Sequence, residues 1–144
     1  MAEFSANAVQ TVNPGETIVF TESPVPCNKG LVRHRDGTGN FLLSGRSNCP
    51  CKKSVNYFVD FGANIAVPTG QTVGAISVAL SVDGATIPPT QMIVTPAAVE
   101  EFFNVSCATN VPIFSNCCES FSIRNTSDIP ILVENANVVF SFKG

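Results

Sequence analysis

The stretch YFVDFGANIAV, residues 57–67, decides the fold class, because its larger apolar side chains recur at every second position. The recurring apolar set is Tyr57, Val59, Phe61, Ala63, Ile65 and Val67. Side chains of a β-strand alternate between two faces, whereas those of a helix share a face about every 3.6 residues. The stretch therefore predicts a long strand with one face in a core, and we expect it to bend at Gly62.

Two other stretches show the same alternation. Over residues 75–82, large apolar side chains alternate with uniformly small ones, namely Ala75, Ser77, Ala79 and Ser81. Near the C-terminal end, the apolar set of a further strand is Ala136, Val138, Phe140 and Phe142. Each pattern indicates a strand with one face in a core. The small face of residues 75–82 indicates that another layer packs closely on it.

Turn signals divide the rest of the chain at short intervals. The clearest are Asn13-Pro14-Gly15, Asp36-Gly37 and Asp83-Gly84, of which the last two predict hairpins. The remaining strands are expected near residues 6–12, 17–22, 31–34, 41–43, 91–94, 102–108 and 120–125. The best helix signal, at residues 96–101, is long enough for one turn only. About eight to ten strands with Gly and Pro turns predict an all-β, single-domain jelly-roll sandwich over residues 1–144.

The composition favours self-association. Hydrophobic residues make up 44% of the chain, but charged residues only 13%, against about 25% in ordinary globular domains. A surface poor in charge is weakly protected against association, so the composition fits a subunit that packs against copies of itself. A β-rich protein with a bland surface fits it equally well.

Several classes of function are disfavoured. The net charge is -3 and no basic run occurs, so nucleic-acid binding through phosphate contacts is not expected. No apolar stretch reaches the ~18 residues of a membrane span, so membrane insertion is not expected. The N-terminal residues lack the pattern of a secretory signal, and we therefore expect assembly in the cytoplasm.

Nothing in the sequence indicates an active site. The single histidine, His34, lies between Arg33 and Arg35 with no nucleophile nearby in sequence, and we expect it at the surface or in an interface. The glycine-flanked serine, phosphate-loop and zinc-protease motifs are missing from the sequence. We therefore expect no enzymatic activity, no catalytic residue, no metal and no cofactor.

The six cysteines are many for a cytosolic protein of this size, and they are Cys27, Cys49, Cys51, Cys107, Cys117 and Cys118. Several of them fall in predicted turns, from which a side chain can reach a neighbouring subunit. One hypothesis is that disulfides crosslink the assembly after it has formed, each worth about 2–4 kcal/mol by analogy with intramolecular bonds. The alternatives are free thiols, or a zinc cluster made by Cys49, Cys51, Cys117 and Cys118.

Several segments resemble the C1q/TNF-like jelly-roll heads of bacterial proteins. The segments are AVQTV at residues 8–12 with Pro14-Gly15, IVF at 18–20, GAISVAL at 74–80, IRNTS at 123–127, ILV at 131–133 and ANV at 136–138. The chain is similar to the heads of collagen-like spore-surface glycoproteins and to short proteins of gut Firmicutes and their tailed phages. The resemblance spans most of the chain and implies a TNF-like trimer without an enzymatic role. The chain lacks the Gly-X-Y stalk of the spore proteins, which leaves a self-contained head.

These observations lead to one functional hypothesis with two alternatives. The first is a structural protein, a homotrimeric jelly roll that decorates or builds the surface of a particle. The leading candidate for this particle is a phage virion. A spore or cell-surface assembly protein is a variant of this hypothesis, with other particle proteins as further partners. The other class is a binding module for a host surface glycan or a receptor. We expect Val138, Phe140 and Phe142 at the trimer axis, with the intramolecular core as the alternative place for them.

Overall fold

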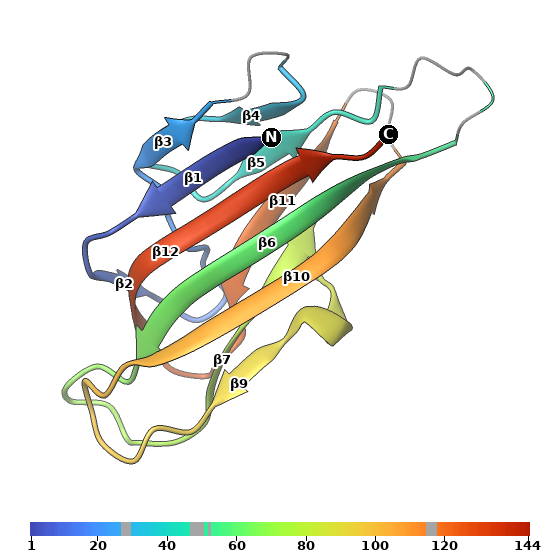
Figure 1. The fold of residues 1–144 in the computed structure, drawn as a ribbon. Helices are drawn as coiled ribbons and strands as arrows, with labels where there is room; N and C mark the ends of the chain where they lie inside the picture. Colours follow the sequence, from blue (N-terminus) through green and yellow to red (C-terminus); the bar gives the residue numbers. More distant parts are fainter. Residues whose placement is uncertain (27–29, 47–50, 52, 115–117) are drawn as a thin grey trace.

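Two six-stranded antiparallel sheets face one another in this computed structural model, which describes residues 1–26, 30–46, 51, 53–114 and 118–144 (Figure 1). Sheet A has the order β10 (Phe103–Ile113), β6 (Val55–Ala66), β12 (Ile131–Phe142), β1 (Ala2–Ala6) and β3 (Glu22–Val25), and β2 (Gln10–Val12) also pairs with β12. Sheet B has the order β4 (Val32–His34), β5 (Phe41–Leu43), β11 (Glu119–Asn125), β7 (Ile76–Val82) and β8 (Ala85–Thr86), and β9 (Met92–Val94) also pairs with β7.

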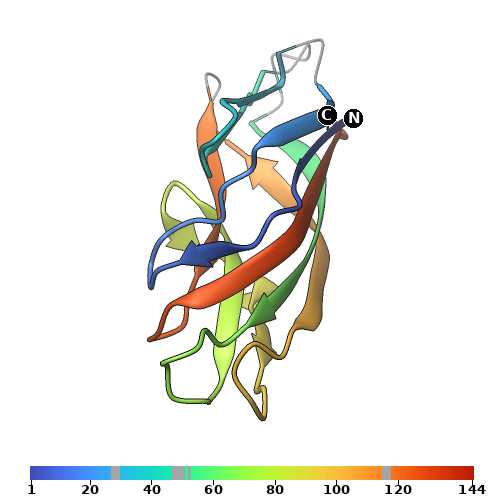
Figure 2. The same cartoon turned by 90° about the vertical axis from the view of Figure 1, so that its left-hand side faces the viewer.

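Strands that are far apart in the sequence lie side by side in both sheets. In sheet A, β12 lies between β6 and β1, so both termini reach the same end of the molecule (Figures 1 and 2). In sheet B, β11 lies between β5 and β7. Chain crossing between two antiparallel sheets in this way is the jelly-roll arrangement, so the predicted all-β fold class is confirmed.

The predicted central strand forms the middle of the core. All six apolar residues of the set that recurs over residues 57–67 are buried, at 1% exposure or less. The hydroxyl of Tyr57 lies 2.7 Å from the carbonyl oxygen of Ser44 and 3.1 Å from that of Leu31, so a sheet A strand also holds loops that flank β4 and β5.

Aromatic rings fill the space between the sheets near the β4–β5 hairpin. The ring centroid of Phe41 lies 4.9–5.3 Å from those of Phe4, Phe20 and Phe140. Edge-to-face and tilted pairs at such separations add about 0.5–1.5 kcal/mol each beyond the burial of their area. The cluster therefore joins β1 and β12 of sheet A to β5 of sheet B.

Some predicted boundaries were wrong. The described residues contain twelve strands rather than eight to ten. The strand expected at residues 6–12 is divided into β1 and β2. In the range 17–22, Thr17 and Phe20 form only isolated bridges, and β3 begins at Glu22. Residues 96–101 form bends and turns; the one helical turn in the described chain is the 3₁₀ helix Pro88–Thr90, where two prolines preset the backbone.

The irregularity expected at Gly62 lies on the neighbouring strand. The pairing of β12 with β6 shifts between Glu134 and Asn137, opposite Asn64 and Gly62. Asn135, inside this bulge, has a φ of 50°, a left-handed conformation that asparagine adopts more readily than most residues.

The small side chains of β7 were expected to let another layer, such as a second subunit, pack on this face. They are instead covered within the same chain. Ser77, Ala79 and Ser81 are 7%, 1% and 0% exposed within the single chain. The Ser77 hydroxyl lies 2.7 Å from that of Thr126, and the Ser77 backbone amide donates to the hydroxyl of Ser127 at 2.7 Å. The close packing indicated by the small residues is therefore met by neighbouring strands and turns of the same chain.

The residues expected at the trimer axis belong mostly to the core. Val138 and Phe140 are 0% and 1% exposed because they lie on the face of β12 that points toward sheet B, so the intramolecular alternative holds for both. Phe142 remains 37% exposed. In the described part of the chain, no helix is long and apolar enough to cross a bilayer.

Candidate binding groove

A groove of about 790 Å³ crosses the outer face of sheet B. The strand order puts the β4–β5 hairpin on one side of it, β11 in the middle and the β7–β8 hairpin on the other side. Its lining residues are Arg33, His34, Arg35, Thr38, Asn40, Leu42, Asp83, Gly84, Ser120 and Arg124. The register explains this set, because Arg33, Leu42 and Ser120 are directly paired across three strands and share the face away from the core.

A second depression adjoins the groove. It has a volume of about 410 Å³ and shares Gly84 and Arg124 with the first. Its other lining residues are Gly15, Thr86, Asn125, Thr126 and Ser127. The concave surface therefore continues past Arg124 toward the segment that follows β11.

Three arginines give the groove a positive charge. Arg33, Arg35 and Arg124 are three of the eight lysines and arginines of a chain whose net charge is -3. The one carboxylate among the described lining residues is Asp83, which accepts hydrogen bonds from the backbone amide of Ser120 at 2.9 Å and from its hydroxyl at 3.2 Å. Among the described residues no carboxylate forms an ion pair with any of the three guanidinium groups. The groove therefore has an excess of positive charge, with three arginines against one carboxylate.

The guanidinium of Arg124 is held in place on one side only. Its Nη1 donates to the carbonyl oxygen of Gly15 at 2.8 Å. Its Nε is buried and has no hydrogen-bond partner among the described residues. A buried N–H donor without an acceptor is uncommon in proteins, so this atom calls for an explanation.

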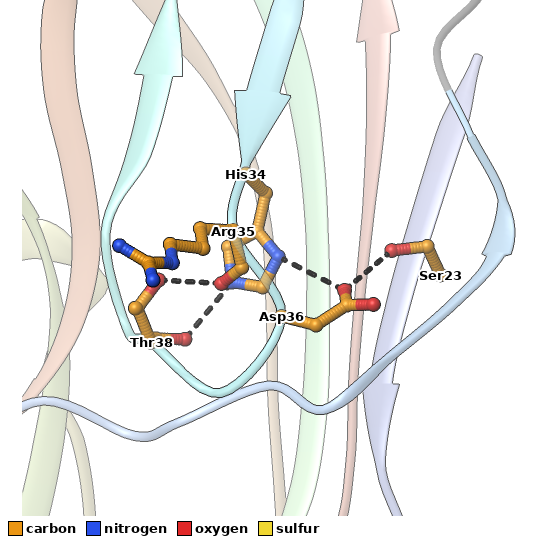
Figure 3. A network of polar contacts seen from close by, with 5 residues as sticks. All are labelled: Ser23, His34, Arg35, Asp36 and Thr38. Carbon is orange, nitrogen blue, oxygen red and sulfur yellow. Dashed lines mark hydrogen bonds and ion pairs between the residues drawn. The ribbon is translucent and has the colours of Figure 1, made fainter.

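His34 is not at the surface, and that expectation was wrong. Its side chain is 0% exposed and its ring stacks on Phe41 with centroids 4.3 Å apart. The ring Nε2 lies 2.9 Å from the carbonyl oxygen of Thr38 (Figure 3). Because a carbonyl oxygen only accepts, Nε2 carries the proton. The histidine therefore packs in the core and closes the β4–β5 turn.

The polar network around His34 is not arranged for nucleophilic catalysis. Asp36 lies between the other two groups: its Oδ1 accepts from the Ser23 hydroxyl at 3.0 Å and lies 3.8 Å from the His34 Nδ1 (Figure 3). In a catalytic triad the histidine lies between the carboxylate and the serine, where it can take the serine proton. Here His34 has no contact with Ser23 through which it could activate that hydroxyl.

Three of the six predicted crosslinking cysteines, Cys27, Cys49 and Cys117, lie outside the described residues. Cys51 takes part in a disulfide bond, and Cys118 is half-buried directly before β11. Cys107 on β10 is a free thiol, and burial, followed by the negative charge of Asp60, raises its pKa. Within the described chain no three His, Cys, Asp or Glu residues are grouped to hold a metal. The disulfide at Cys51 rules out the four-cysteine zinc cluster, because zinc binds cysteine as a thiolate. Crosslinks between subunits remain a prediction.

Comparison with known proteins establishes the fold. No protein-family model matches the chain, and no curated protein matches its sequence. The globular domain of zebrafish complement 1qA protein superimposes with a TM-score of 0.56 and 11% identity, over 96% of this chain and 94% of that one. The Eiger TNF of S. frugiperda superimposes with a TM-score of 0.61 and 13% identity, over 97% of this chain and 90% of that one. The chain therefore has the jelly-roll fold of C1q and TNF domains, as the sequence resemblance implied.

Sequence reasoning missed the groove as a site. In the sequence, Arg33 and Arg35 stand out only as neighbours of His34, and Arg124 only as part of a strand pattern. A usable signal was present, because arginine is scarce in this chain and each of these residues lies within or beside a strand, where it cannot face the core unpaired. The pairing that brings the residues together could not be deduced from spacing.

Proposed function

We propose that the chain is a non-enzymatic structural module that assembles as a homotrimer and decorates or builds the surface of a particle. The first candidate is a phage virion, in which it would be a capsid decoration protein or a fibre head. A bacterial spore or cell surface is the alternative location. The chain shares the jelly-roll fold of C1q and TNF domains. The sequence resemblance to bacterial heads with this fold implies a trimer, and the fold supports that expectation.

The observation that carries the proposal is the outer face of sheet A. Strands β6, β10 and β12 are 11 or 12 residues long and offer a broad surface. Their register places Ala108, Asp60 and Val139 in one row, and Ser106, Gly62 and Asn137 in the next. Most of these side chains are small or uncharged, so another subunit can approach closely at a low cost of desolvation.

The strands of this sheet carry few charges, all of them carboxylates. The six strands of sheet A contain no lysine or arginine. The carboxylate of Glu3, on β1, accepts a hydrogen bond from the amide of Asn137 at 2.7 Å. Phe58 adds a half-buried aromatic ring on the same face as Asp60. Aromatic side chains at the centre of an interface contribute most of the binding energy in many complexes.

Size-exclusion chromatography with light scattering tests the trimer at micromolar concentration. We expect a mass three times that of the 15.2 kDa chain. Ala108→Arg places a long charged side chain on the exposed part of sheet A and should yield monomers. Ala85→Arg is the matched control, because Ala85 is also exposed but lies on β8 of sheet B. A stable wild-type monomer would refute the trimer.

The location needs a separate measurement. Peptides of this chain should be found by mass spectrometry in purified virions of a phage from the same source, at a stoichiometry of a structural component. Peptides found in purified spores or cell envelopes, and missing from virions, would move the proposal to its alternative. Absence from all three would overturn the particle-surface role without affecting the trimer.

A further inference from the structure

The positive groove on sheet B has no part in the trimer proposed above, because it lies on the opposite sheet from the proposed interface. We infer that this groove binds an acidic polysaccharide, with Arg33, Arg35 and Arg124 holding its carboxylate or sulfate groups. The charge, the geometry and the polar lining of the groove support this site.

The charge of the groove is concentrated and unused. Three like-charged side chains line one surface of an acidic chain, and no described carboxylate pairs with them. A guanidinium group presents several donors in a planar fork that fits a carboxylate or a sulfate with two parallel hydrogen bonds. An anion in the groove would relieve the repulsion between the arginines and supply these bonds.

Arg124 is already oriented for such a ligand. Its bond to the Gly15 carbonyl fixes the guanidinium, so little side-chain entropy is lost when a ligand binds. Its Nε remains buried without an acceptor among the described residues, and it is a lining residue of both depressions. A ligand group between the two depressions would lie beside this residue.

The other lining groups indicate a sugar chain. Asn40, Thr38 and Ser120 offer an amide and hydroxyls, and Asp83 offers a carboxylate that can accept from a sugar hydroxyl. The two adjoining depressions, of about 790 and 410 Å³, suit an extended ligand better than a single small anion. In the described part of the chain, the lining includes no Phe, Tyr or Trp on which a base could stack, which disfavours single-stranded nucleic acid. Asp83 in the groove disfavours an acidic peptide with closely spaced carboxylates.

Isothermal titration calorimetry with defined polymers tests the inference. The probes are dextran sulfate and polygalacturonate, with neutral dextran as the reference, at low and at physiological ionic strength. We expect both polyanions to bind and neutral dextran not to bind. The double variant R33Q/R35Q should weaken binding about tenfold or more, since each arginine makes charge-assisted hydrogen bonds. Arg124→Lys, which keeps the charge but loses the fork, should also weaken it.

A control variant with the same net charge separates a site from diffuse attraction. R46Q/K143Q also removes two exposed positive charges, both outside the groove, and should leave the affinity unchanged. Circular dichroism of each variant checks the fold, and light scattering of the same samples reports the trimer independently. Equal weakening by the two double variants would overturn the inference, as would a failure of both polyanions to bind. Tighter binding of polyglutamate or of single-stranded DNA would overturn the choice of a polysaccharide.

Discussion

Replacing Asn125 by alanine should destabilise the fold far more than its size suggests. The side chain is 1% exposed and makes three hydrogen bonds to backbone groups outside β11. Its Nδ2 donates to the carbonyl oxygens of Val12 at 2.9 Å and Ile129 at 3.0 Å, and its Oδ1 accepts from the amide of Ser127 at 2.8 Å. One side chain therefore ties β2 and the turn before β12 to the end of β11.

The magnitude follows from what is left behind. Val12 is 2% exposed, so we expect its carbonyl to lose its partner without gaining water, which costs about 1–3 kcal/mol. Ile129 and Ser127 are half-buried, so water can replace part of each bond, and each should lose only about 0.5–1 kcal/mol. The sum is a loss of about 2–5 kcal/mol in the free energy of unfolding. For a domain of this size that corresponds to a fall in Tm of roughly 10 °C.

Urea denaturation followed by circular dichroism measures the effect, because the chain has no tryptophan and a single tyrosine. All variants are compared at one protein concentration, since assembly adds to apparent stability. Asn104→Ala is the matched control: Asn104 is exposed, and its Nδ2 bonds to Asn64 at 3.1 Å and more weakly to the carbonyl oxygen of Ala63 at 3.4 Å. We expect it to change stability by less than about 0.5 kcal/mol. Equal losses for the two variants would refute the reasoning from burial.

Two further results are expected. Gly39→Ala should destabilise by about 1–3 kcal/mol, because a Cβ there would lie 2.6 Å from the backbone oxygen of Ile18, whereas Gly74→Ala, with open space around it, should be nearly neutral in the same urea assay. Alkylation of Cys107, followed by mass spectrometry of its peptide, should show a pH midpoint above that of an ordinary thiol, because burial and the charge of Asp60 raise its pKa. Asp60→Asn should lower that midpoint without restoring it fully, because burial is the larger cause; no change in the midpoint would contradict the contribution of the charge.

The sequence predicted the parts of the fold that depend on local pattern. The alternation over residues 57–67 was sufficient for β6, because every second side chain there is large and apolar. The division between β1 and β2 was missed, since the break after Ala6 depends on how β12 pairs with both strands. Alternation alone could not decide whether Val138 faces the core of its own chain or a partner subunit, because a core and a subunit interface are both apolar. The groove could not be predicted for a related reason. The pairing register of β4, β5 and β11 brings Arg33 and Ser120 into one row, and the sequence does not show this register.

The place of β12 between β6 and β1 has a consequence for synthesis on the ribosome. β1 can pair early with β3, but Phe4 pairs with Val138, so β1 finds its second sheet partner only after residue 138 has been translated. At about 5–20 residues per second, β1 waits on the order of 10 s, and β6 meanwhile presents one unpaired edge. Nascent chains are then vulnerable to pairing with each other through these edges. Cells producing this protein should therefore gain yield from slower initiation, which spaces the nascent chains apart, more than from faster elongation.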